Sequence, residues 1–183
     1  MLFRSGANTA TATVTDNQDG TYTAVYTPTI AGSDNVAITL NGEAIGGSPY
    51  SSVVSPGSAN ASQSRATVPG GTAGALTTVT VQTRDAYGND LTSGGATVAM
   101  TVTGANSATA NVTDNGDGTY SASYTPALAG TDDLAITLNG TAIGGGPYSS
   151  VVSSGTASAA QSTATVPDGT AGAETTITVV TRD

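Results

Sequence analysis

The chain has 183 residues, of which only 9% are charged, and its formal net charge of −9 leaves an acidic or neutral surface. Its four cationic residues are all arginines, which excludes the basic stripe that a nucleic-acid or anionic-lipid partner requires. Because it has neither cysteine nor histidine, it forms no disulfide and lacks the usual zinc and copper ligands, so we expect no metal and no other cofactor.

The chain repeats itself with a period of 98 residues. Val14 returns as Val112, and residues 6–85 align with residues 104–183 without a gap. Of the 80 aligned pairs, 59 are identical. A period of about 100 residues is too long for helical or leucine-rich solenoids and is typical of an immunoglobulin-sized sandwich.

This period divides the chain into four parts. Residues 1–5 interrupt the repeat and resemble a translated sequencing adapter, so we expect an artefact and leave them out of the fold. Residues 6–57 correspond to the C-terminal part of a first immunoglobulin-like repeat, 58–155 to a complete repeat, and 156–183 to the N-terminal part of a third. Because the chain stops in the middle of a unit, we do not expect a natural terminus there.

Within the complete repeat, apolar residues alternate with small polar ones. Val79 and Val81, for example, are separated by Thr80, and alternation of this kind between Gly, Asn, Asp and Pro clusters indicates half-buried antiparallel strands. Seven short strands in a unit of about 100 residues predict an all-β, Greek-key β-sandwich. The expected strands cover residues 64–68, 76–84, 96–103, 108–113, 119–125, 133–139 and 147–153.

Residues 114–118, Asp-Asn-Gly-Asp-Gly, are the strongest metal candidate in the sequence. A calcium loop of the EF type needs side-chain oxygens at its positions 1, 3 and 5. Glycines occupy positions 3 and 5 here, and residues 16–20 fail in the same register. The segment therefore predicts a hairpin turn, as does the pair Asn139-Gly140.

An ordered set of motifs in the complete repeat resembles the filamin-type immunoglobulin-like repeat. The resemblance implies tandem β-sandwiches, and the bias toward Thr, Ser, Gly and Ala is similar to bacterial adhesin modules of the invasin and intimin type. One departure is the run Thr131-Asp132-Asp133, where the family often has an aromatic residue. The motifs are residues 68–74, 83–89 and 114–120, then Tyr124-Thr125-Pro126, Ala129-Gly130, Asn139-Gly140 and Gly146-Pro147-Tyr148.

The sequence offers no candidate catalytic residues, and we do not expect an enzyme. Histidine and lysine, the bases that activate a nucleophile, are both missing. Asp132 and Asp133 are adjacent carboxylates, but neighbours on a strand point to opposite faces. A solvated loop edge is the interpretation we favour for this pair.

Three further features have structural interpretations. Tyr120 and Tyr124 share one strand face, which favours packing in the sheet over stacking on carbohydrate. Arg84-Asp85 predicts either an ion pair at a buried edge or a turn contact, and the sequence leaves both open. The N-x-S/T sequons are expected by chance in so Thr-rich a chain, and begin at Asn60, Asn111 and Asn139.

Two classes of function fit these observations. The first is a non-catalytic stalk or spacer of a large bacterial surface or secreted protein, such as an adhesin, whose partners are neighbouring repeats. It would be extracellular, without inserting into a membrane, because no apolar run approaches the roughly 20 residues that span a bilayer.

The alternative is a module that binds a peptide, a glycan or a cell-surface ligand, or an accessory domain of a secreted enzyme. The strand predicted over 96–103 has neither charge nor proline, so it is open to pairing with a partner strand. Its candidate partner-binding residues are Val98, Met100 and Val102.

Overall fold

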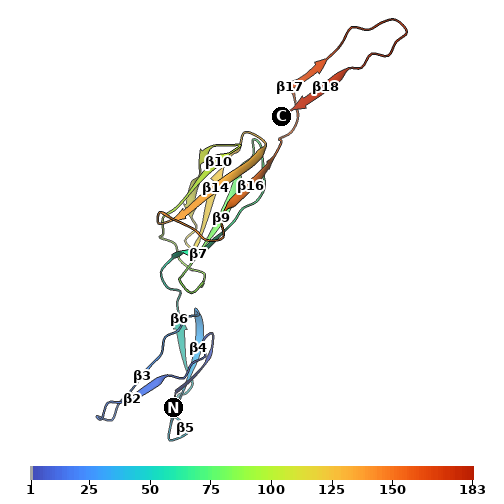
Figure 1. Cartoon of the computed structure of the whole chain (residues 1–183). Coiled ribbons are helices and arrows are strands. Elements are labelled where there is room, and N and C mark those ends of the chain that lie inside the picture. Colours follow the sequence, from blue (N-terminus) through green and yellow to red (C-terminus); the bar gives the residue numbers. More distant parts are fainter. Residues whose placement is uncertain (1) are drawn as a thin grey trace.

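A computed structural model describes residues 2–183, with side chains from Ser5 onward, and these residues form strands and turns without a helix. The predicted all-β class is confirmed. No helix that could cross a membrane occurs in the described part of the chain. The chain is elongated: a complete sandwich lies between an N-terminal group of strands and a C-terminal hairpin, in a row (Figure 1).

The complete sandwich consists of two facing sheets. One has the order β12-β13-β9-β7, and the other has the order β11-β10-β14-β16-β8, with β15 paired to β14. The strands are β7 (Asn60–Thr67), β8 (Gly71–Thr72), β9 (Thr77–Arg84), β10 (Val98–Gly104), β11 (Ala108–Thr109), β12 (Asn111–Asp114), β13 (Thr119–Tyr124), β14 (Gly130–Leu138), β15 (Thr141–Ala142) and β16 (Tyr148–Ser153).

The core lies between these two sheets and follows the predicted alternation. In β9 and β13, every second residue is buried while the intervening Thr and Ser residues face outward or lie half-buried. Tyr120 and Tyr124 are only 2% and 4% exposed, so their predicted packing in the sheet is confirmed. The buried cluster comprises Val79, Val81, Val98, Met100, Val102, Tyr120, Ala122, Tyr124, Leu134, Ile136, Leu138 and Ile143.

Two elements differ from the sequence prediction. The strand predicted over 108–113 is divided between the two sheets, because the chain crosses from β11 to β12 at Ala110, whose N–H donates to the Met100 carbonyl. β14 begins at Gly130, so Asp132 and Asp133 lie inside a strand. The hairpin after β14 is confirmed. Asn139 has a φ of 50° and Gly140 a φ of 81°, and a two-residue hairpin turn with positive φ at both residues requires such values.

The N-terminal group repeats only part of this sandwich. β4 pairs with β6, and β2 with β3, in the registers of β14–β16 and β12–β13 shifted by 98 residues. Residues 2–5, which were expected to be an artefact outside the fold, form β1 together with Gly6 and pair with β4 where β10 pairs with β14. The strands are β1 (Leu2–Gly6), β2 (Thr13–Asp16), β3 (Tyr22–Val25), β4 (Gly32–Leu40), β5 (Glu43–Ala44) and β6 (Tyr50–Val54).

The C-terminal part is a hairpin of β17 (Ser158–Thr165) and β18 (Thr178–Arg182) that projects beyond the complete sandwich (Figure 1). Its register, including the irregularity between Ser158 and Thr163, is that of β7–β9 shifted by 98 residues. The hairpin therefore has the shape of the first strands of a repeat without the sheets that would cover them.

Candidate functional site: the joint between consecutive repeats

The turn after β9 is built around one buried carboxylate. Asp85 is only 2% exposed, and its Oδ1 accepts hydrogen bonds from the backbone N–H groups of Tyr87 and Asn89, both at 2.9 Å. Its Oδ2 accepts from the Asn89 side chain and from the backbone N–H of Gly57, both at 2.8 Å. Since Gly57 precedes the complete sandwich, Asp85 ties the connecting segment to this turn.

Asn89 extends the contact to the preceding group of strands. Its Nδ2 donates to the Thr29 carbonyl at 2.8 Å, and its Oδ1 accepts from the Ala31 N–H at 2.9 Å. Both partners belong to the loop between β3 and β4. One amide side chain, held by Asp85, therefore satisfies a donor and an acceptor of the neighbouring repeat.

The loop between β3 and β4, which Asn89 contacts, is held in place by Asn8. Asn8 accepts hydrogen bonds from the N–H groups of Thr29 and Ile30, and donates to the Ile30 carbonyl at 2.7 Å. The backbone of Asn8 donates in turn to Asp34, which is fully buried. A continuous hydrogen-bonded path thus runs from Asp34 across the joint to Asp85.

Two parts of this arrangement recur one period later. Gly155 N–H donates to Asp183 Oδ2 at 2.6 Å, as Gly57 does to Asp85. At the far end of the complete sandwich, Asn106 holds the N–H groups of Ala127 and Leu128, as Asn8 holds their counterparts. The Gly–Asp contact and the loop held by an asparagine therefore belong to the repeat unit.

The pKa of Asp85 is set by two opposing effects. Burial raises it, but the hydrogen bonds from the Asn89 side chain and from the backbone of Gly57, Asn89 and Tyr87 outweigh burial and lower it to about 2. The pKa of an aspartate in an unfolded chain is about 3.9. The stabilisation that Asp85 gives is therefore complete above about pH 4 and is lost as the pH falls through about 2.

The two interpretations of Arg84-Asp85 are now separated. Asp85 makes turn contacts, while the Arg84 guanidinium pairs with Asp90 at 2.6 Å. The two side chains of this ion pair are 37% and 56% exposed, so it contributes little to stability.

The candidate residues of the edge strand face the core. Val98, Met100 and Val102 are 8%, 1% and 1% exposed, so a partner cannot reach their side chains. In a strand, alternate residues direct their N–H and C=O groups to the same neighbouring strand. The Met100 carbonyl points away from β14, toward Ala110, so the backbone groups of Val98 and Val102 point to that outer side as well. What β10 can offer a partner is its backbone.

The acidic turn over 114–118 is a hairpin between β12 and β13. Asp114 accepts from the N–H groups of Gly116 and Gly95, and these bonds lower its pKa. Asp117 accepts from the backbone N–H and the hydroxyl of Thr119. Both carboxylates thus have local partners, as turn residues do.

Asp132 corrects another expectation. It is fully buried and accepts hydrogen bonds from Asn106 and from the Tyr124 hydroxyl, so it does not lie at a solvated loop edge. Asp133 is exposed on the opposite face of β14, as the strand alternation predicted. The pair is divided between the core and the solvent.

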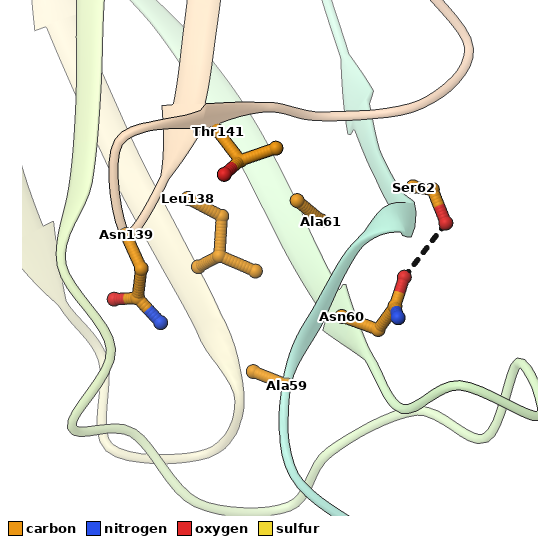
Figure 2. Close-up of a pocket in the computed structure, with 7 residues that line it drawn as sticks. All are labelled: Ala59, Asn60, Ala61, Ser62, Leu138, Asn139 and Thr141. Atoms are coloured by element: carbon orange, nitrogen blue, oxygen red, sulfur yellow. Dashed lines mark hydrogen bonds between the residues drawn. The ribbon is translucent and has the colours of Figure 1, made fainter.

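Two of the predicted sequons meet at a shallow hollow of about 340 Å³ beside β7 and the β14–β15 hairpin. Figure 2 shows Asn60 joined to Ser62, whose hydroxyl donates to it at 2.7 Å, with Leu138 lying between Asn139 and Ala61. The Asn139 Oδ1 accepts the Thr97 N–H at 2.9 Å. Both asparagine oxygens therefore have structural partners.

The fold and its repeated joint define a tandem array of immunoglobulin-like β-sandwich repeats. The Filamin/ABP280 repeat family model matches residues 4–51 and 58–149, so the chain belongs to the filamin repeat family, which is structural and non-enzymatic. It is 36% identical over 141 residues to Filamin-C of Mus musculus and 33% identical over 138 residues to Filamin-A of Drosophila melanogaster. Each match covers 74% of this chain but only 5% and 6% of those proteins.

Two solved structures of bacterial proteins share the fold. The Escherichia coli adhesin FdeC is 31% identical with a TM-score of 0.72, over 100% of this chain and 61% of that one. InvD of Yersinia pseudotuberculosis is 24% identical with a TM-score of 0.54, over 99% of this chain and 57% of that one. The likeness to FdeC extends along the whole of this chain.

Proposed function

We propose that these repeats act as an extended stalk or spacer of a bacterial surface protein, extracellular and without catalysis. The observation that carries the proposal is the joint in which Asp85 and Asn89 connect consecutive repeats. Its Gly57–Asp85 contact recurs as Gly155–Asp183 one period later. Strands of up to nine residues plus end loops give each unit about 30–40 Å of reach. Because each repeat is held in a fixed orientation to its neighbour, the lengths of successive repeats add along one direction.

The expected strength of the joint suits this role. Asn89 makes two hydrogen bonds across it, and a hydrogen bond in a protein contributes about 0.5–1.5 kcal/mol. Together they are worth about 1–3 kcal/mol, enough to favour one orientation by roughly 5- to 150-fold. The stalk is therefore straight on average while remaining able to bend under load.

A tandem of two copies of residues 58–155 tests the joint. Since the chain lacks cysteine, Val151→Cys in each copy provides two unique sites for spin labels on an exposed side chain. We expect a narrow distribution of label–label distances by electron paramagnetic resonance, which Asn89→Ala in the second copy broadens. Lowering the pH toward 2 should broaden it too, because about half of the Asp85 carboxylates are then protonated.

Asp90→Ala is the matched control, because it removes only an exposed ion pair one residue away. It should leave the distribution narrow. A wild-type distribution as broad as that of Asn89→Ala would contradict a stalk with ordered joints.

A second candidate function is binding of a peptide strand at the edge of β10. Among the described residues, the outer side of β10 is paired only with β11, at Thr101 and Val102, and with Ala110 through the Met100 carbonyl. The preceding part of the strand, at Val98, keeps its outward backbone groups open to β-augmentation.

Selection of peptides from a random display library against the full chain tests this candidate. Selected peptides should shift the backbone amide NMR signals of Val98 and Met100 first. Shifts confined to other strands, or a selection without binders, would remove the β10 edge as a binding site.

A further inference from the structure

The hollow beside β7 and the β14–β15 hairpin is lined by side chains that can donate hydrogen bonds (Figure 2). The Oδ1 atom of Asn60 accepts the Gln63 N–H at 3.3 Å, and that of Asn139 accepts the Thr97 N–H at 2.9 Å. Because the oxygen of each amide is held by a backbone group, the orientation of its nitrogen is fixed as well. Neither Nδ2 atom has a partner among the described residues, so both are available to a ligand.

The rest of the lining is uncharged. Thr141 adds an exposed hydroxyl, and none of the seven lining residues is acidic, although the chain has 13 Asp and Glu residues. The apolar part is small, since Ala59 and Ala61 are half-buried and Leu138 is only 1% exposed. A ligand in this hollow is therefore recognised mainly through its polar atoms.

A cation lies next to this lining. The Nη1 atom of Arg65 donates to the carbonyl oxygens of Ser62 at 2.7 Å and Ser64 at 2.9 Å, and Ser62 lines the hollow. Arg84 is paired with Asp90, whereas no carboxylate of the described residues lies within ion-pair distance of Arg65. The N–H groups on its Nε and Nη2 atoms remain for an anion.

Two glycines make room for this arginine. A Cβ atom at Gly145 would lie 2.7 Å from Arg65 Cδ, and one at Gly144 would overlap Arg65 Nη1. Larger residues at these positions would push the guanidinium away. The loop after β15 therefore helps to hold Arg65 beside the hollow.

The apolar lining returns in the neighbouring copies of the repeat, but the donors do not. Ala59, Ala61 and Leu138 are unchanged at an offset of 98 residues. A contact that only supports the sandwich would be expected in every copy, so the difference favours a ligand. The changed pairs are Asn60 and Ser158, Ser62 and Ala160, Arg65 and Thr163, and Thr141 and Glu43.

We propose that this hollow binds an acidic saccharide, a sugar whose ring carries a carboxylate. The carboxylate pairs with the Arg65 guanidinium, and the hydroxyl oxygens of the ring accept from the amide nitrogens of Asn60 and Asn139. The volume of about 340 Å³ lies at the small end of the range for ligand sites, about 300–1,000 Å³, and suits one ring. This inference does not rest on the stalk function, and either can fail without the other.

A titration of the full chain followed by amide NMR tests the proposal, with glucuronate as the probe and glucose as its neutral counterpart. Because the hollow is shallow, we expect a Kd of about 1–10 mM for glucuronate. The signals of Ala61, Ser62 and Gly140 should shift first. Glucose, which lacks the carboxylate, should bind at least about 10-fold more weakly.

Two variants take the residues that the neighbouring copies carry, so the fold accommodates both. Arg65→Thr should weaken glucuronate binding at least about 10-fold, because the carboxylate loses its cation. Thr141→Glu should abolish binding, because it places a second carboxylate against that of the ligand. Arg84→Thr is the matched control: it removes the same charge from an exposed ion pair elsewhere and should bind as the wild type does.

Equal affinity for glucuronate and glucose would overturn the proposal, as would the lack of any shift at about 50 mM glucuronate. Equal weakening by Arg65→Thr and Arg84→Thr would do so too, because net charge alone would then explain the binding. If N-acetylglutamate bound more tightly than glucuronate, the hollow would be a site for acidic peptides and the saccharide would be excluded.

Discussion

Tyr120→Ala is expected to lower the free energy of unfolding of the complete sandwich by about 3–5 kcal/mol, the range for removing a buried aromatic side chain. Tyr120 is 2% exposed in the core, and its hydroxyl accepts the Ala96 N–H at 2.9 Å. The substitution leaves a cavity and an unpaired backbone donor. Calorimetry of the full chain should show the main transition about 15–30 °C lower.

Tyr22→Ala is the control for this prediction, because Tyr22 occupies the same place in the repeat but is 60% exposed. At low concentration it should leave the main transition within about 0.5 kcal/mol of the wild type. Tyr120→Phe, which keeps the ring and removes only the hydroxyl, should cost about 1 kcal/mol. Equal losses from Tyr22→Ala and Tyr120→Ala would show that the core is not where the structure places it.

Residues 58–155 are expected to fold alone in one cooperative transition, whereas residues 6–57 alone stay largely unfolded. The first segment contains both sheets and the whole buried apolar cluster. In the second, Ala12 is the only buried apolar side chain among the described residues. So little burial cannot offset the loss of chain entropy on folding.

Urea titration followed by circular dichroism, together with amide NMR spectra, measures both segments. A sloping transition for 58–155 would invalidate the repeat boundaries, which remain a prediction. Dispersed amide signals from 6–57 at low concentration would show that strands of one half-repeat are stable without the strands that cover them.

Adding an excess of residues 156–183 as a peptide tests this explanation, because β17 and β18 have the register of the first strands of a repeat. If the hairpin supplies the missing strands, the peptide should induce dispersed signals in 6–57, and the Val179→Asp peptide should not.

The sequence by itself determined the architecture, because period-two alternation and turn residues are local signals. Val79 and Val81 identify a half-buried strand from their spacing, and Asn139-Gly140 identifies a hairpin because these residues tolerate positive φ. The 98-residue repeat added the organisation, since identical segments adopt one design. These features depend on residues close together in the chain.

Only the tertiary structure decided which polar groups are buried and what they hold. From the sequence, Asp132 is expected to be an exposed carboxylate. Only the fold brings Asn106, 26 residues away, and the Tyr124 hydroxyl of another strand into hydrogen bonds with it. Asp85 and Asn89 likewise look like ordinary turn residues, because their contacts to Gly57 and Thr29 join separate repeats. The one available signal was the return of Asp85 as Asp183 at the joint.

The tertiary structure also decided the two surfaces. Val98, Met100 and Val102 lie in β10, beside the short strand β11. Whether a strand shows its side chains or its backbone to a partner depends on which face the opposite sheet covers. Tyr22 is 60% exposed where Tyr120 is 2% exposed, because no strand of the described residues packs beside β3 as β9 packs beside β13. Burial of a side chain depends on what packs against its strand, so the residues of the strand alone do not determine it.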